Sequence, residues 1–148
     1  MSEAQLEEMG PIDYVVMEWD GDQPVTGEVM PLLLDLVDRG LIRILDIAFI
    51  VKDRDGSVMA RDLAEMAQEG AGLADFEGAA SGLIGQEDLE EAAAALEPGT
   101  VAAVLVWENR WAAPVAVALR RSGGQLVASG RIPVQSIIAS LDASEAVR

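Results

Sequence analysis

Two tryptophans bracket a carboxylate, an amide and a guanidinium in one short segment, Trp107-Glu108-Asn109-Arg110-Trp111. Aromatic surface beside such polar groups is what a ligand or partner site offers. A structural interpretation also fits: Trp107 fills the edge of the core, and Asn109 caps a helix that starts near Arg110. The segment is therefore a candidate ligand or partner site, and the structural alternative stays open.

A second glutamate–tryptophan pair, Glu18-Trp19, belongs to the same candidate site. It ends a strand that we expect beside the strand ending at Glu108, so the sequence suggests that Glu18 and Glu108 lie near each other. Two close carboxylates shift each other's pKa or bind a cation. Arg131, on a predicted edge strand, is the expected ion-pair partner of Glu108.

The chain contains no Cys and no His. Disulfides, thiolate nucleophiles and Cys/His zinc sites are thereby excluded, as are a Ser-His-Asp triad and proton transfer by imidazole. Carboxylates, arginines, hydroxyls, Tyr14 and the single Lys52 remain for chemistry. We predict no catalytic, cofactor-binding or metal-binding residue, and the sequence favours a protein without enzymatic activity.

The composition predicts a folded, acidic, cytoplasmic protein. Hydrophobic residues make up 51% of the 148 residues, and the net charge is −16. So acidic a surface repels nucleic acid and anionic membranes, since phosphate contacts need Lys and Arg. No uninterrupted apolar stretch approaches the roughly 20 residues that span a bilayer. The acidic start, MSEAQLEEMG, lacks the basic and apolar regions of a signal peptide.

The residue pattern predicts one domain built on six core elements. Apolar and β-branched runs predict strands, and apolar residues at helical spacing predict helices. In order these are strand 12–19, helix 28–39, strand 42–53, strand 100–108, helix 111–122 and strand 125–132. Residues 54–99 form a helical insertion at the middle hairpin, and a short helix over 133–141 follows the last strand. The predicted boundaries are an acidic N-terminal tail over 1–10, the domain over 11–142 and a loose C-terminal tail over 143–148.

The two halves of the chain repeat one pattern. Pro31 precedes Gly40 by the same interval as Pro114 precedes Gly123, and each glycine leads into a predicted strand. Two such strand–helix–strand units packed side by side give an α+β fold, the split βαβ or ferredoxin-like sandwich. The sequence therefore predicts a ferredoxin-like domain with a helical insertion.

One face of the predicted sheet lacks an assigned cover. The first strand is apolar on both sides, and the two core helices cover only one face of the sheet. The insertion, the terminal helix or a second subunit must cover the other. We expect a homodimer that uses this face at least in part.

Five segments together resemble a known family: GPIDYVVMEW, DRGLIRILD, DRDGSV, VWENRWAAP and GGQLVASGRIP. They look like small actinobacterial proteins catalogued only as a domain of unknown function. That family is similar to a wider bacterial group in which a ferredoxin-like domain carries a glycine-rich helical insertion. The resemblance covers residues 10–133 and implies the fold and the place of the insertion, but no activity. In the wider group the insertion is membrane-like, whereas here it is shorter and interrupted by Glu69, Asp75, Glu77 and Glu87.

Three functions are compatible with these features. The first, which the sequence favours, is a structural or interaction protein that self-associates into homo-oligomers. The second is a small-molecule-binding module with a pocket between sheet and insertion, near Trp19, Trp107 and Trp111. The third is an enzyme that uses the two glutamates and the arginine named above. Besides a second copy, a basic protein or a small molecule is the alternative partner.

Overall fold

The computed structural model describes residues 2–22, 28–61 and 81–146. The chain forms two compact units, Met1–Ala118 and Leu119–Arg148. The first unit contains α1 (Glu3–Glu7), β1 (Ile12–Asp20), α2 (Val29–Asp38), β2 (Ile42–Lys52), β3 (Val58–Arg61), α4 (Gln86–Ala95), β4 (Thr100–Asn109) and the short 3-10 helix η2 (Arg110–Ala112). Helix α5 (Ala113–Arg121) begins in the first unit and ends in the second, which also holds α6 (Val134–Ala146).

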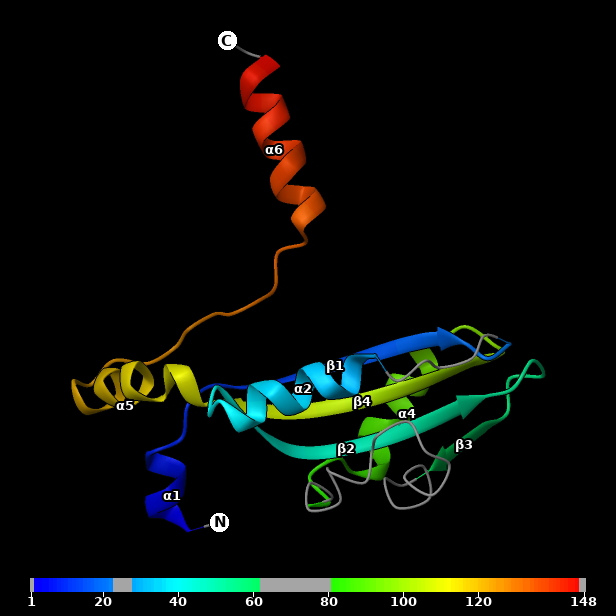
Figure 1. The fold of residues 1–148 in the computed structure, drawn as a ribbon, viewed down its shortest axis with the longest axis horizontal. Coiled ribbons are helices and arrows are strands. Elements are labelled where there is room, and N and C mark those ends of the chain that lie inside the picture. Colours follow the sequence, from blue (N-terminus) through cyan, green and yellow to red (C-terminus); the bar gives the residue numbers. More distant parts are fainter. Residues whose placement is uncertain (1, 23–27, 62–80, 147–148) are drawn as a thin grey trace. The chain divides into compact units, whose positions relative to one another are not determined.

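The first unit is built on a four-stranded antiparallel sheet in the order β1-β4-β2-β3 (Figure 1). Strand β4 pairs along its whole length with both β1 and β2. Strands β1 and β2 are therefore parallel to each other, with β4 between them, and α2 connects them. The predicted α+β class is confirmed, and the three long strands lie within a residue or two of their predicted ranges.

One face of the sheet packs under α2. The buried residues there come from the two central strands, and half-buried residues of β1 and α2 pack against them. The buried set is Ile47, Phe49, Ala103 and Leu105, and α2 contributes Met30, Leu33, Leu34 and Val37. Pro31 lies in the first turn of α2, where its missing N–H needs no partner. Gly40 ends the turn after α2 with a φ of 71°, the left-handed conformation predicted from the sequence.

The opposite face of the sheet is covered in part by α4. Ile50, Ala102 and Val104 are buried there against Ala93 and Leu96 at the end of α4. The Nζ of Lys52 donates hydrogen bonds to the carbonyl oxygens of Ala93 (2.9 Å) and Leu96 (3.0 Å). These two carbonyls at the C-terminal end of α4 thus gain a positive partner, which also complements the helix dipole.

The predicted insertion is described only at its two ends. Strand β3 is the return strand of a hairpin whose turn follows β2, and residues 81–99 contain α4. Most of the glycine-rich stretch between them, residues 62–80, lies outside the described residues. The insertion therefore supplies at least one cover for the second face of the sheet, through α4.

The prediction of a strand over 125–132 is wrong. In the second unit these residues form neither helix nor strand, and α6 begins directly after Pro133. A run with strand propensity adopts a regular strand only when hydrogen-bonded to a neighbour, because pairing must offset the entropy of ordering the backbone. Ser129-Gly130 also interrupts the apolar pattern of this run.

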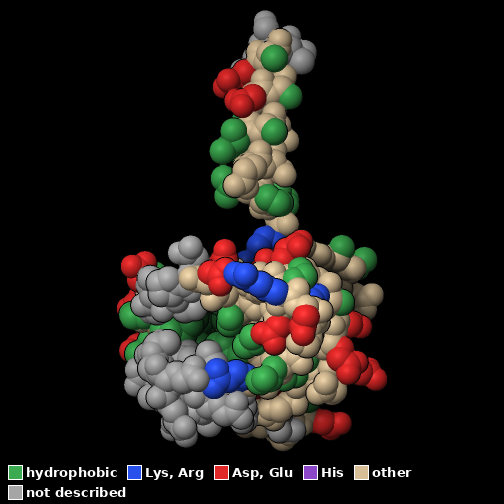
Figure 2. Space-filling model, turned by 90° about the vertical axis from the view of Figure 1, so that its right-hand side faces the viewer, with side chains coloured by type: hydrophobic (Ala, Val, Ile, Leu, Met, Phe, Trp, Pro, Cys, Tyr) green, Lys and Arg blue, Asp and Glu red, His purple; other side chains and the backbone are tan. Residues whose placement is uncertain are grey.

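Helix α6 carries an exposed apolar stripe. It is longer than predicted and ends at Ala146, past the start of the predicted tail at 143. Its apolar residues recur at helical spacing: Val134, Ile137, Ile138 and Leu141. Figure 2 shows hydrophobic side chains along the length of this helix. The stripe is the pattern of a helix that packs on an apolar partner.

Candidate functional site

Glu108 is a buried carboxylate with structural partners. It is 5% exposed, and its Oε2 accepts a hydrogen bond from the backbone N–H of Gly10 at 2.9 Å. Its Oε1 lies 3.1 Å from the Nε of Arg43, the residue directly opposite on β2. The sequence analysis did not single out Arg43, and the partner that it proposed, Arg131, belongs to the second unit. Glu108, on β4, thus contacts both the segment that precedes β1, through Gly10, and strand β2, through Arg43.

Asn109 does not cap the following helix, so that prediction is wrong. It stands at the N-cap position of η2, but its side chain makes no capping hydrogen bond. Its Oδ1 accepts a hydrogen bond from the Nε1 of Trp107 at 3.1 Å, and its Nδ2 donates to Asp13 at 2.7 Å and to the carbonyl of Pro11 at 3.2 Å. The strand pairing, which brings β1 alongside β4, offers Asp13 and Pro11, and Trp107 lies two residues earlier on β4.

The tryptophans of the candidate site do not converge. Trp19 and Trp107 pack into the core under α2, which confirms the structural interpretation of Trp107. Trp111 follows on η2 and is exposed, as is Arg110. Glu108 lies on the opposite face of the sheet from Trp107, because successive residues of a strand point to opposite faces. The five residues of this segment therefore serve different surfaces.

The predicted proximity of Glu18 and Glu108 is also wrong. Strands β1 and β4 are antiparallel, and their register places Ile12 opposite Glu108 and Glu18 opposite Ala102. The two glutamates are therefore about 20 Å apart along the strands, at about 3.3 Å per residue. Glu18 instead accepts a hydrogen bond from the backbone N–H of Glu97 at 2.9 Å. They do not form a carboxylate pair.

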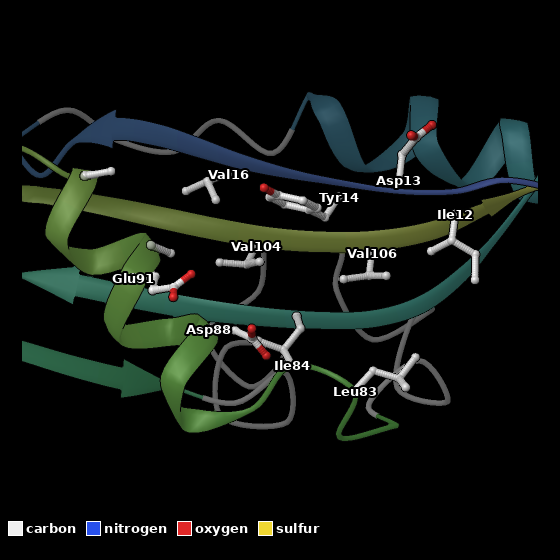
Figure 3. Close-up of a pocket in the computed structure, with 12 residues that line it drawn as sticks. Ile12, Asp13, Tyr14, Val16, Leu83, Ile84, Asp88, Glu91, Val104 and Val106 are labelled. Carbon is white, nitrogen blue, oxygen red and sulfur yellow. The ribbon is translucent and has the colours of Figure 1, made fainter. Parts of the chain in front are cut away.

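A groove lies between the sheet and α4, on the face opposite the half-buried Trp19 and Trp107 (Figure 3). Its volume is about 510 Å³. The sequence analysis expected a pocket between sheet and insertion, and residues 83–95 of that insertion do line this one. The expected pocket was near Trp19, Trp107 and Trp111, and none of these three residues lines this groove. The lining residues are Ile12, Asp13, Tyr14, Val16, Leu83, Ile84, Asp88, Glu91, Ala92, Ala95, Val104 and Val106.

The groove is apolar, with acids on one wall. Val104 and Val106 form its floor, and Tyr14 lies over the sheet with its hydroxyl toward Val16 (Figure 3). Asp88 and Glu91 stand on the α4 wall, and Asp88 already accepts a hydrogen bond from the N–H of Gly85 at 2.8 Å. The side chain of Asp13 points out of the groove, toward its hydrogen bond with Asn109. Such a site suits apolar groups better than anions.

Two other acids, Asp46 and Asp55, also accept hydrogen bonds from the chain itself. Buried Asp46 on β2 accepts hydrogen bonds from the N–H groups of Ile47 (3.0 Å) and Ile84 (2.8 Å). The second of these bonds holds the segment just before α4 against the sheet. In the exposed turn after β2, hydrogen bonds from the Ser57 hydroxyl and backbone N–H lower the pKa of Asp55. Within residues 2–22, 28–61 and 81–146, no group of three or more acids is arranged to hold a metal ion.

Comparison with protein families matches residues 8–147 to a family of unknown function, DUF6325. The chain belongs to this family. The predicted membership of a domain of unknown function is confirmed, and the DUF6325 region includes β1, the groove residues and all of α6. No curated protein and no solved structure matched the chain. In the described part of this DUF6325 protein, no helix is both long and apolar enough to cross a membrane.

Proposed function

We propose that this DUF6325 protein is a non-catalytic interaction protein that self-associates, and that two copies meet at the face bearing the groove. One observation carries the proposal: the groove-facing apolar residues of β1 are left uncovered. Tyr14 is 74% exposed, and Ile12 and Val16 are exposed beside it. Apolar patches of this kind, next to a groove, mark sites of association.

The same surface suits a symmetric dimer. A two-fold interface uses one patch on both copies, so the patch must complement itself. Aromatic and β-branched side chains meet that condition, because burial of apolar surface is non-directional. The net charge of −16 opposes association, and salt screens it. Self-association is therefore expected to strengthen as salt rises.

The contacts of the chain's polar groups favour binding over catalysis. Glu108 and Asp46 are held by backbone N–H groups, and Lys52 is held by two carbonyls of α4. Glu18 likewise accepts a backbone hydrogen bond. General acid–base catalysis needs such groups within reach of a substrate. In these positions they support the fold.

We also propose that the sheet follows the ferredoxin-like plan. The first half already has two parallel strands, β1 and β2, joined by α2 and separated by β4. A second βαβ unit, starting with β4 and α5, would place its returning strand beyond β1. The plan therefore needs one more strand on the outer edge of β1.

Light scattering after size exclusion tests the self-association. The wild type is expected to be a dimer whose proportion rises with protein concentration and with salt. Tyr14→Asp is expected to weaken the dimer by about 2 kcal/mol, roughly 30-fold, because exposed aromatics at interface centres contribute that much. Val115→Asp, on α5, is the control, since Val115 is as exposed (73%) and the charge change is the same.

Either of two outcomes would reject this function. One is a wild type that stays monomeric at every concentration and salt. The other is a Tyr14→Asp variant that dimerises as the wild type does. Circular dichroism of each variant must show the same melting temperature as the wild type, so that a loss of dimer reflects the surface and not the fold.

A small-molecule-binding module is the second candidate, because the groove's volume falls in the roughly 300–1,000 Å³ range of ligand pockets. Its charged lining residues are all acids, so the matching ligand is apolar with a cationic amine. Phenylbutylamine is a suitable probe. A monomeric wild type whose melting temperature rises with this amine would favour the second candidate. Glu91→Gln should then reduce the rise.

A further inference from the structure

A bulge in β2 turns Asp46 toward the groove face of the sheet. The register of β2 against β4 shifts between Ile44 and Asp46, where Leu45 is the extra residue. Ile44 packs on the face under α2, and strict alternation would put residue 46 on that same face. The bulge instead places Asp46 opposite Val106, which lines the groove.

The bulge holds the segment that leads into α4. The Ser81 hydroxyl donates a hydrogen bond to the carbonyl oxygen of Leu45 at 2.5 Å. One carboxylate oxygen of Asp46 accepts the N–H of Ile84 at 2.8 Å, and the other accepts the N–H of the next residue in the strand. Because Asp46 is buried, its hydrogen bonds are stronger than they would be in water. Residues 81–84 are therefore latched to β2 at the bulge.

The C-terminal end of α4 is anchored in a different way. Ala93 and Leu96 are buried against the sheet, and the Lys52 side chain holds the carbonyl oxygens of both. The N–H of Gly99 donates to the carbonyl oxygen of Lys52 at 2.7 Å, which ties the chain after the helix to β2 as well. Leu89, in the first half of α4, is only half-buried against the same cluster. Among the described residues, the buried apolar contacts of α4 are thus concentrated at its C-terminal end.

We propose that residues 81–91 are a hinged wall of the groove, latched to β2 by Asp46 and opening about the C-terminal end of α4. A segment opens locally when its own few contacts break, and here the latch supplies the polar ones. Asp46 is a positioning residue in this scheme, because it acts through Ile84. Four lining residues of the groove belong to the wall: Leu83, Ile84, Asp88 and Glu91 (Figure 3).

Opening of this wall changes the width of the groove. When the latch is released, residues 81–91 move away from the sheet while Ala93 and Leu96 stay in place. The groove then admits a bulkier apolar group than the closed form does. This inference goes beyond the proposed function, since it concerns the shape of the groove and applies to either occupant, a second copy or a small molecule.

Thiol labelling of single-cysteine variants of the full chain tests the hinge, because the chain has no Cys of its own. Ala48→Cys lies two residues from Asp46 on the same face, and Ala102→Cys lies opposite Ile50, toward the hinge end. Adding Asp46→Ala is expected to raise the labelling rate of Ala48→Cys about tenfold, because loss of a charged hydrogen bond favours opening. The rate at Ala102→Cys should rise less than about twofold, since the hinge end stays closed.

Three further variants control the test. Asp46→Asn should give an intermediate rate at Ala48→Cys, because one amide oxygen can hold only one of the two N–H groups. Ser81→Ala removes the other latch contact without removing a buried charge, and should raise that rate about threefold. It decides the question if Asp46→Ala does not fold. Glu18→Gln changes the charge equally at the hinge end, where an amide oxygen still accepts the N–H of Glu97, and should leave both rates unchanged.

Two results would overturn the hinge. One is a labelling rate at Ala48→Cys that responds to neither latch variant. The other is an equal rise at Ala48→Cys and Ala102→Cys, which would show that α4 leaves the sheet as one body. The rates are measured at several protein concentrations, because protection by a second copy grows with concentration and closure of the wall does not. Failure of self-association would therefore leave the hinge standing.

Discussion

Glu108→Ala is expected to lower the free energy of unfolding by about 3 kcal/mol. The substitution removes the acceptor of the Gly10 N–H and the ionic partner of Arg43 in one step. Removing one partner of a buried, charged contact typically costs about 3–5 kcal/mol. The Arg43 side chain is partly exposed, which brings the estimate to the lower end. Urea denaturation followed by circular dichroism measures the change.

Two controls separate the contributions at Glu108. Glu108→Gln keeps an oxygen for the Gly10 N–H but loses the charge, so it should destabilise less than alanine. Glu18→Ala removes an exposed glutamate that accepts one backbone hydrogen bond, and its effect should stay below about 1 kcal/mol. Equal stability of Glu108→Ala and the wild type would show that the buried carboxylate does not stabilise this end of the sheet.

Gly10→Ala is expected to destabilise the chain by a similar amount, about 3 kcal/mol, through steric overlap. An added Cβ would lie 2.2 Å from the carbonyl oxygen of Asn109 and 3.1 Å from the Cα of Ala113. Both neighbours are backbone atoms, so no side-chain rotation relieves the overlap. The backbone must move, and the hydrogen bond from Gly10 to Glu108 would lengthen or break.

Gly130→Ala is the matched control for Gly10→Ala. An added Cβ at Gly130 meets nothing within 4 Å, so the change should alter stability by less than about 0.5 kcal/mol. The same urea titrations compare the two glycine variants. In a Glu108→Ala background Gly10→Ala should cost less than in the wild type, because the two residues share one hydrogen bond. Additive effects would contradict the coupling.

Local patterns in the sequence predicted the main elements of the first unit. The apolar runs of β1, β2 and β4 have the composition of strands buried on one or both faces, and Gly40 has the backbone conformation that a helix end requires. These features depend on neighbours in sequence. For that reason the sequence was sufficient to place them.

The pairing of Glu108 with Arg43 could not be predicted in the same way. It depends on the register of β2 against β4, which shifts between Ile44 and Asp46 where Leu45 is bulged out. One extra residue in a strand changes which side chains face each other. No local pattern fixes a bulge of that kind, so the sequence analysis gave Glu108 a different partner.

The groove was expected beside the tryptophans and lies on the other face, for a reason that the sequence did contain. Trp107 and Glu108 are adjacent in the chain, and the candidate site treated them as one cluster. The two-residue period of a strand separates them, as it separates Trp19 from Glu18. The alternation of Tyr14 and Val16 with Val15 and Met17 was the signal for a second apolar surface. Only the position of α4 turned that surface into a groove.

The contact of Lys52 with α4 gives the protein a built-in reporter. Lys52 is the only lysine in the chain, and its ammonium group is held by two carbonyls at the end of that helix. Acylation requires the amine nitrogen to reach the reagent, so it must first leave these two carbonyl oxygens. Amine-directed reagents should therefore modify Lys52 at the rate at which α4 opens from the sheet. The labelling rate of Lys52 would report how often α4, one wall of the groove, separates from the sheet.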